Sequence, residues 1–139
     1  MGYGLAGAMV QRFQNDSDDS IVALRQVIDL GKLWAGVAPA GPASTPYVVI
    51  SEISRQLVSE CKGQLSQIFA VTLQIDCFTT NQSGCEQLLD LLEDAYVGRP
   101  LDISPHSWLD CSVSGRWIEA KDKTVREILQ LQVSVEKTR

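Results

Sequence analysis

Apolar residues recur along the chain with two different periods, and the change of period separates predicted helices from predicted strands. Between 18 and 30 the apolar side chains lie three or four residues apart, at Ile21, Leu24 and Ile28. This spacing predicts an amphipathic helix. Polar cap residues from 15 to 20 precede it and Gly31 follows it, so both ends carry the expected signals.

A second helical stripe predicts a helix from about Ser83 to Tyr96. Ser83 and Glu86 have the spacing of a capping box, in which each side chain accepts a hydrogen bond from the other residue's backbone N–H. Gly98 and Pro100 provide a stop. The apolar stripe comprises Leu88, Leu91, Leu92, Ala95 and Tyr96.

Four other segments alternate or are rich in β-formers, which predicts strands. The clearest is 65–77, where the inward positions are Leu65, Phe69, Val71, Leu73, Ile75 and Cys77. Residues 125–135 alternate in the same way, with Val125, Leu129, Leu131, Val133 and Val135 on one face. In 47–57, Tyr47, Val49, Ile53 and Leu57 share the predicted inner face, which Arg55 interrupts. A short strand is predicted at 33–37.

The segment 107–119 is also a predicted strand, and its tryptophans fall on different faces. Strict alternation puts Leu109, Cys111, Val113 and Trp117 on one face. Trp108 then shares the other face with Arg116 and Ile118. Two interpretations of Trp108 stay open: an exposed anchor for a protein interface, or a side chain covered by a helix.

The connections complete a fold prediction. Residues 38–46 hold three prolines and one glycine, so this stretch is an extended link. Polar hairpin tips are expected at 59–64 and 120–123. The order of elements predicts one α+β domain over 16–139, with a mostly antiparallel sheet of four to five strands and two helices packed on one face. Residues 1–15 are expected to form a mobile or weakly ordered N-terminal arm.

Composition and charge narrow the function. The 139 residues are 45% apolar and 21% charged, with a formal net charge of −5. This acidic balance argues against a generally basic nucleic-acid binder. No apolar run approaches the ~20 residues of a membrane span. The first ten residues lack the basic start of a signal peptide, so we expect synthesis in the cytoplasm.

No pattern in the sequence points to catalysis, a metal or a cofactor. The cysteines at 61, 77, 85 and 111 form no CxxC pair, and His106 is the only histidine, so zinc spacing is missing. We expect the cysteines to be free and structural. A nucleophile–base pair using Cys61 or His106 is the weakest alternative. Residues 2–7 spell GxGxxG, but no strand precedes them to aim a nucleotide-binding turn.

Charges are unevenly distributed along the chain. Between Asp76 and Asp110 there are seven acidic residues and one basic residue, whereas the segment from Arg116 to Arg139 has six basic and four acidic residues. These regions could meet across a head-to-tail subunit contact, or could be ordinary solvated surface. The acidic side of the second helix, at Asp90, Glu93 and Asp94, is interpreted as a solvated face rather than a catalytic carboxylate pair.

Four stretches, covering about 21–135, give the chain a recognisable order. They are a helix ending in Asp29-Leu30-Gly31 with a strand through Gly36-Val37, the Pro-rich lead into Pro46-Tyr47-Val48-Val49-Ile50, the strand Thr72-Leu73-Gln74-Ile75-Asp76-Cys77-Phe78 leading to a helix near Asn81, and the closing strands around 120–135. In this order the chain resembles the tail-completion family of long-tailed bacteriophages, which includes tail-terminator and tail-to-head-joining proteins. Residues before Asn15 lie outside the resemblance.

The resemblance implies a structural virion protein of a phage or prophage, without catalytic residues or cofactor. Such proteins form a ring, usually a hexamer, at the head-proximal end of the tail, where they stop growth of the tube and join the tail to the head. The implied partners are further copies of the chain, the tail tube protein and the head–tail connector. The alternative is a small ligand-binding or regulatory α+β dimer, which needs a concave apolar pocket. The expected interaction residues are Glu60, Lys62, Gly63, Trp108, Arg116, Lys121 and Lys123.

Overall fold

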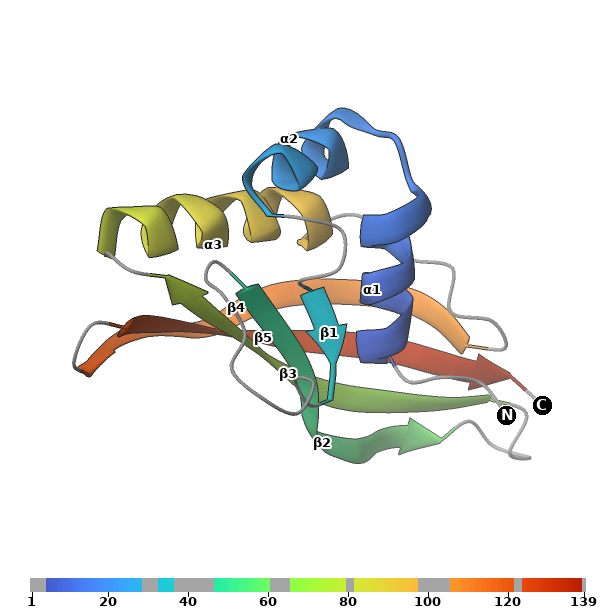
Figure 1. Ribbon diagram of the computed structural model, residues 1–139. Coiled ribbons are helices and arrows are strands. Elements are labelled where there is room, and N and C mark those ends of the chain that lie inside the picture. Colours follow the sequence, from blue (N-terminus) through green and yellow to red (C-terminus); the bar gives the residue numbers. More distant parts are fainter. Residues whose placement is uncertain are drawn as a thin grey trace.

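The part of the chain that the structure describes forms one five-stranded sheet with three helices (Figure 1). The computed structural model describes residues 5–28, 33–36, 47–60, 66–79, 82–97, 106–121 and 124–138. Its elements are α1 (Leu5–Asn15), α2 (Asp19–Val27), β1 (Leu33–Ala35), β2 (Tyr47–Glu60), β3 (Ser66–Thr79), α3 (Gln82–Tyr96), β4 (His106–Lys121) and β5 (Thr124–Thr138).

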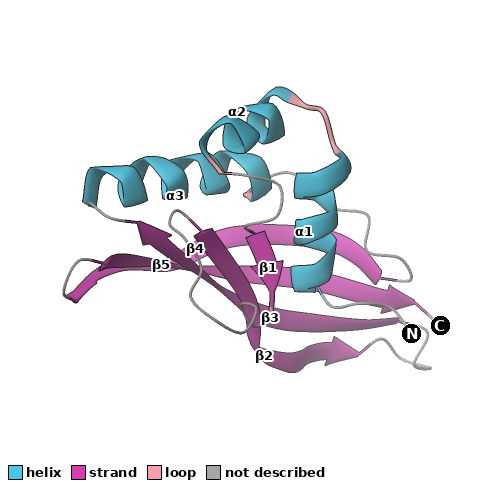
Figure 2. Ribbon diagram, viewed as in Figure 1, coloured by secondary structure: helices cyan, strands magenta, loops and turns pink. Residues whose placement is uncertain are grey.

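The sheet has the strand order β1-β2-β3-β5-β4. The short β1 runs parallel to β2, and every other neighbouring pair is antiparallel. All three helices lie on one side of the sheet (Figure 2). The predicted α+β class with a mostly antiparallel sheet is therefore confirmed, with one helix more than the sequence pattern indicated. None of the described helices has the length and apolar character to cross a membrane.

The two central strands, β3 and β5, provide the floor of the core. Their register sets Val71 opposite Val133, Leu73 opposite Leu131, and Ile75 opposite Leu129. All six side chains are fully buried, because alternation by two puts each of them on the face that the helices cover. The predicted inward faces of these two strands are thus confirmed, except at Leu65, which lies outside the described residues.

The N-terminal segment differs from the expected arm. From Leu5 onward it is the helix α1, and it buries Leu5, Ala6, Ala8, Met9 and Phe13 in the core. Tyr96 of α3 donates its hydroxyl hydrogen to the Met9 carbonyl oxygen, at 2.7 Å between the oxygens. The helix was not predicted, because the segment contains many small residues and the helix is stabilised by tertiary packing.

Helix boundaries also moved. Helix α3 begins at Gln82, so Ser83 lies inside the helix and cannot be the N-cap of the predicted capping box. The helix predicted for 18–30 extends from Asp19 to Val27. Its N-cap Asp18 makes no side-chain bond to a helix N–H; the carboxylate instead accepts hydrogen bonds from Arg12 and Ser20. Residues 29–32, with the predicted stop at Gly31, lie outside the described residues.

Two β-bulges in each outer long strand change part of the predicted faces of β2 and β4, although Trp108, Arg116 and Ile118 share one face as predicted. Ile53 and Val58 are the additional residues of β2 relative to β3, and Leu109 and Ser114 those of β4 relative to β5. Each bulge reverses the alternation that follows it. At the start of β2, moreover, the side chains on the helix side are Val48 and Ile50, both fully buried, rather than Tyr47 and Val49.

The same effect corrects the position of Trp108. Trp108 lies opposite Val135, and Cys111 lies opposite Val133, so both belong to the face that the helices cover. Trp108 is half-buried and packs against the core. Trp117, in contrast, lies opposite Ile128, which places it on the other face. The bulge at Leu109 puts Trp108 and Cys111 on the same face, against the prediction, and the second bulge at Ser114 restores the predicted difference between Trp108 and Trp117.

Candidate functional site

Arg116 of β4 connects three elements through one guanidinium group. Its Nε donates to Glu127 Oε1 of β5 at 2.8 Å. One terminal nitrogen donates to Asp90 at 2.8 Å and to Glu93 at 3.3 Å, both on α3. The other terminal nitrogen donates to the backbone carbonyl of Glu86 at 3.1 Å. The guanidinium therefore ties the acidic helix to the edge of the sheet.

The electrostatics of this cluster depend on burial. Glu127 is 1% exposed, and its Oε2 has no hydrogen-bond partner, so the charge of Arg116 is its main compensation. Partial burial alone would lower the pKa of Arg116, but hydrogen bonds and charge from Glu127 and Asp90 outweigh it and raise the pKa above its ordinary value. Arg116 is thus a permanent cation at this position.

A hollow of about 540 Å³ opens beside the guanidinium. It is wide open to solvent, and most of its lining residues are charged: Glu86, Asp90, Arg116, Trp117, Ile118 and Glu127. The concave apolar site that a small-molecule-binding domain uses has a different character. This hollow therefore gives no support to the alternative of a ligand-binding module.

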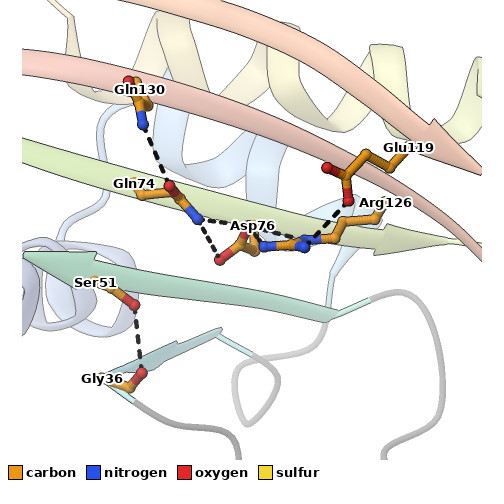
Figure 3. Close-up of polar contacts among 7 residues, drawn as sticks. All are labelled: Gly36, Ser51, Gln74, Asp76, Glu119, Arg126 and Gln130. Atoms are coloured by element: carbon orange, nitrogen blue, oxygen red, sulfur yellow. Dashed lines mark hydrogen bonds and ion pairs between the residues drawn. The ribbon is translucent and has the colours of Figure 1, made fainter. Parts of the chain in front are cut away.

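A row of polar side chains crosses the sheet face that the helices leave uncovered (Figure 3). Gln130 donates to Gln74 at 3.3 Å, and Gln74 in turn donates to the Asp76 carboxylate at 3.2 Å. Arg126 completes the row by donating to Asp76 at 2.8 Å and to Glu119 at 3.2 Å. The row holds neighbouring strands in register through side chains as well as through the backbone ladder.

Aromatic rings continue this uncovered face towards β1. Tyr47 and Phe78 stack with ring centroids 4.6 Å apart, and Trp34 tilts against Tyr47 at 5.6 Å. The Arg126 guanidinium lies 5.9 Å from the Phe78 centroid, within the range of a cation–π contact. The side chains of this face therefore contact one another, from the polar row through Arg126 to the aromatic rings.

These contacts change the interpretation of the charge bias. The acidic region that includes Asp76 and Asp90 meets the basic C-terminal region within a single chain, through Arg126 and Arg116. The bias by itself is therefore no evidence for a contact between subunits. The acidic side of α3 is also more than a solvated face, because Asp90 and Glu93 both bind Arg116.

The expected interaction residues are only partly described. Arg116 is in the ion cluster and Trp108 is packed against the core. The side chains of Glu60 and Lys121 lie outside the described residues, although their backbones belong to β2 and β4. Lys62, Gly63 and Lys123 lie outside them altogether. The role of these residues in interactions stays a prediction.

The described residues offer little reactive chemistry. Cys77 and Cys111 are buried thiols outside any disulfide. Burial, with a smaller effect of Asp110, raises the pKa of Cys111 to about 11, which is unsuited to a thiolate nucleophile. The described residues include no group of three metal-binding side chains. Residues 5–7 of the glycine motif are helical, and the side chains of His106 and Cys61 lie outside the described residues.

Sequence reasoning overlooked Glu127, although a signal for it exists. The alternating series of β5 has apolar residues at 125, 129, 131, 133 and 135, and Glu127 occupies the one charged position in that series. A carboxylate at an inward position needs a cationic partner. The partner, Arg116, lies on the neighbouring strand opposite Leu129, two residues from Ile118, the residue that pairs with Glu127. The bulges of β4 prevented that pairing from being predicted.

Comparisons with known proteins agree with this architecture. The family model described as tail completion protein gp17 matches residues 10–136. A solved chain from the virion of a native gene transfer agent particle has the same fold, with a TM-score of 0.72 at 18% identity. The similarity covers 95% of this chain and 94% of that one. No curated protein matches the sequence.

Proposed function

Because the chain belongs to the tail completion protein gp17 family, a family of structural proteins of phage tails, we propose that it acts as a ring at the head-proximal end of the tail. There it ends growth of the tail tube and joins the tail to the head. The family match carries the proposal, since it extends from residue 10 to residue 136 and so covers almost the whole fold rather than one motif.

A ring is a closed assembly in which each copy presents one surface to the preceding copy and a different surface to the next. A small domain suits this role when it is rigid and has two separate contact surfaces. The Arg116 cluster and the buried core of β3 and β5 provide the rigidity. The proposed ring is a hexamer whose other partners are the tail tube protein and the head–tail connector, assembled in the host cytoplasm.

The hairpin tips are the proposed contacts with those partners. They lie around Glu60, Lys62 and Gly63 at the end of β2, and around Lys121 and Lys123 at the end of β4. Exposed hairpin tips can be changed without disturbing a core. Their positively charged lysines would suit acidic surfaces on the tube or the connector.

Inactivation of the coding sequence in its parent phage or prophage tests the proposed function. We expect unjoined heads and tails in negative-stain images of the lysate, with tails of uncontrolled length. Expression of the wild-type chain from a plasmid should restore joined particles, and a frameshifted copy should not. Normal virions in the absence of the protein would contradict the proposal.

A further inference from the structure

The two long strands at the borders of the sheet expose apolar side chains where polar ones are expected. On β2 these are Ile53, Leu57 and Val58, which are 49%, 50% and 64% exposed. On β4 they are Leu109 and Val113, at 48% and 42%. We call the two sets the β2 border patch and the β4 border patch. Edge strands are usually protected by charge, proline or cover, so exposed apolar groups on both edges need an explanation.

Among the residues that the structure describes, the outer side of β2 has no strand partner over most of its length. In the described chain, β1 pairs with β2 only at Val48, Val49 and Ile50. The β2 border patch lies beyond that short pairing. On the opposite border, β5 is the only described strand that pairs with β4. Each patch is therefore at an open edge, and the two edges are separated by the full width of β3 and β5.

The two patches lie at the same level along the strands. Leu57 pairs with Phe69, Phe69 with Val135, and Val135 with Trp108, next to Leu109. Four residues further along β3, Leu73 pairs with Glu52, the neighbour of Ile53. On its other side Leu73 pairs with Leu131, and Leu131 pairs with Val113. The cross-sheet register therefore aligns the β2 border patch with the β4 border patch, so a second copy placed beside the first needs no shift along the strands.

Strand direction fits the same arrangement. The pairs β2–β3, β3–β5 and β5–β4 are all antiparallel, so β2 and β4 run in opposite directions. When an identical copy is repeated by rotation about an axis parallel to the strands, its β2 lies antiparallel to the β4 of the first copy. Antiparallel neighbours are the more stable kind.

We infer that the β2 border patch of one copy docks on the β4 border patch of the next. This inference rests on the proposed ring and names its subunit contact. The occupant is a second copy of this chain because the chain itself carries both patches, level with each other and on strands of suitable direction. Bulges at Ile53, Val58 and Leu109 interrupt a continuous backbone ladder, so apolar side chains make most of the contact.

Opposite charges placed on the two patches test this contact. Leu57→Glu and Leu109→Lys change residues that are about half exposed, so each variant should fold. Assembly is measured by sedimentation velocity of the purified chain, alone and with the tail tube protein of its phage. We expect each single variant to weaken assembly at least about tenfold. The double variant should regain assembly, because the introduced glutamate of one copy faces the introduced lysine of the next.

Val22→Glu is the matched control, since Val22 is 40% exposed on α2 and belongs to neither border. It should assemble like the wild type. The border contact would be overturned if both single variants assembled as well as the wild type, or if the double variant assembled no better than the single variants. Either result would leave the ring proposal intact. A wild-type chain that stays monomeric with the tube protein present would overturn the ring proposal as well.

Discussion

At the scale of single residues, the contacts of Arg116 show how a small domain can accommodate a buried carboxylate, that of Glu127, near the edge of its sheet. The Arg116 side chain is 27% exposed, and the Glu127 side chain that it binds is 2% exposed. A buried carboxylate without a cation is costly, whereas a complete pair is close to neutral relative to apolar side chains. Arg116 thus offsets the free-energy cost of burying Glu127 and adds little stability beyond that.

Removal of one partner should therefore cost more than removal of both. We expect Arg116→Met to lower the free energy of unfolding by about 2 kcal/mol, because Glu127 loses its partner. The double variant Arg116→Met with Glu127→Leu should recover most of that loss. Chemical denaturation followed by circular dichroism measures both. A double variant less stable than the single one would show that the pair is intrinsically stabilising.

At the scale of the elements, the sequence predicted those parts where side chains alternate without interruption. β3 and β5 pair with no bulge, so their buried faces could be read from the sequence. β2 and β4 contain bulges, and no local residue pattern marks where an additional residue enters a strand. The Arg116–Glu127 pair was missed for the same reason, since it depends on the register of β4. Helix α1 was missed because its stability comes from packing on distant residues.

The attachment of α1 to α3 gives a test at this scale. Tyr96→Phe removes the hydroxyl that donates to the Met9 carbonyl oxygen and leaves that buried acceptor unsatisfied. We expect a loss of about 1–2 kcal/mol in the free energy of unfolding, and faster amide exchange in α1 than in β3 and β5. The matched control is Tyr47→Phe, at a half-buried ring on the uncovered face. Equal effects of both substitutions would contradict a special role for the Met9 contact.

At the scale of the whole molecule, the fold combines one covered sheet face with one face that is ordered by its own side chains. The polar row from Gln130 to Glu119 and the aromatic rings stabilise the uncovered face. The helices cover the other face (Figure 2). The borders of the sheet are then the places where exposed apolar side chains gather, which agrees with assembly through the edges of the domain.

Global stability should fall in alkaline solution. The pKa of Cys111 is about 11 in the folded chain and 9.0 for an unperturbed thiol. Below pH 9 both states keep the proton; between pH 9 and 11 only the folded state keeps it, so the free energy of unfolding decreases as pH rises. Burial also raises the pKa of Tyr96, which acts in the same direction above pH 10. Denaturation midpoints at a series of pH values measure the decline.

Cys111→Ala should make that decline shallower between pH 9 and 11, although it lowers stability at neutral pH through the lost packing. The comparison isolates the thiol, because the other three cysteines are present in both chains. A variant with an unchanged slope would place the origin of the pH dependence elsewhere in the molecule.

The bulges of β2 and β4 also bear on how many copies can join. A bulged strand bends and twists more strongly than a regular one. Straight, flat borders would let copies add without limit, as in a cross-β fibre. In the proposed ring, bent borders would turn each added copy through an angle, so that the last copy meets the first and no free border is left.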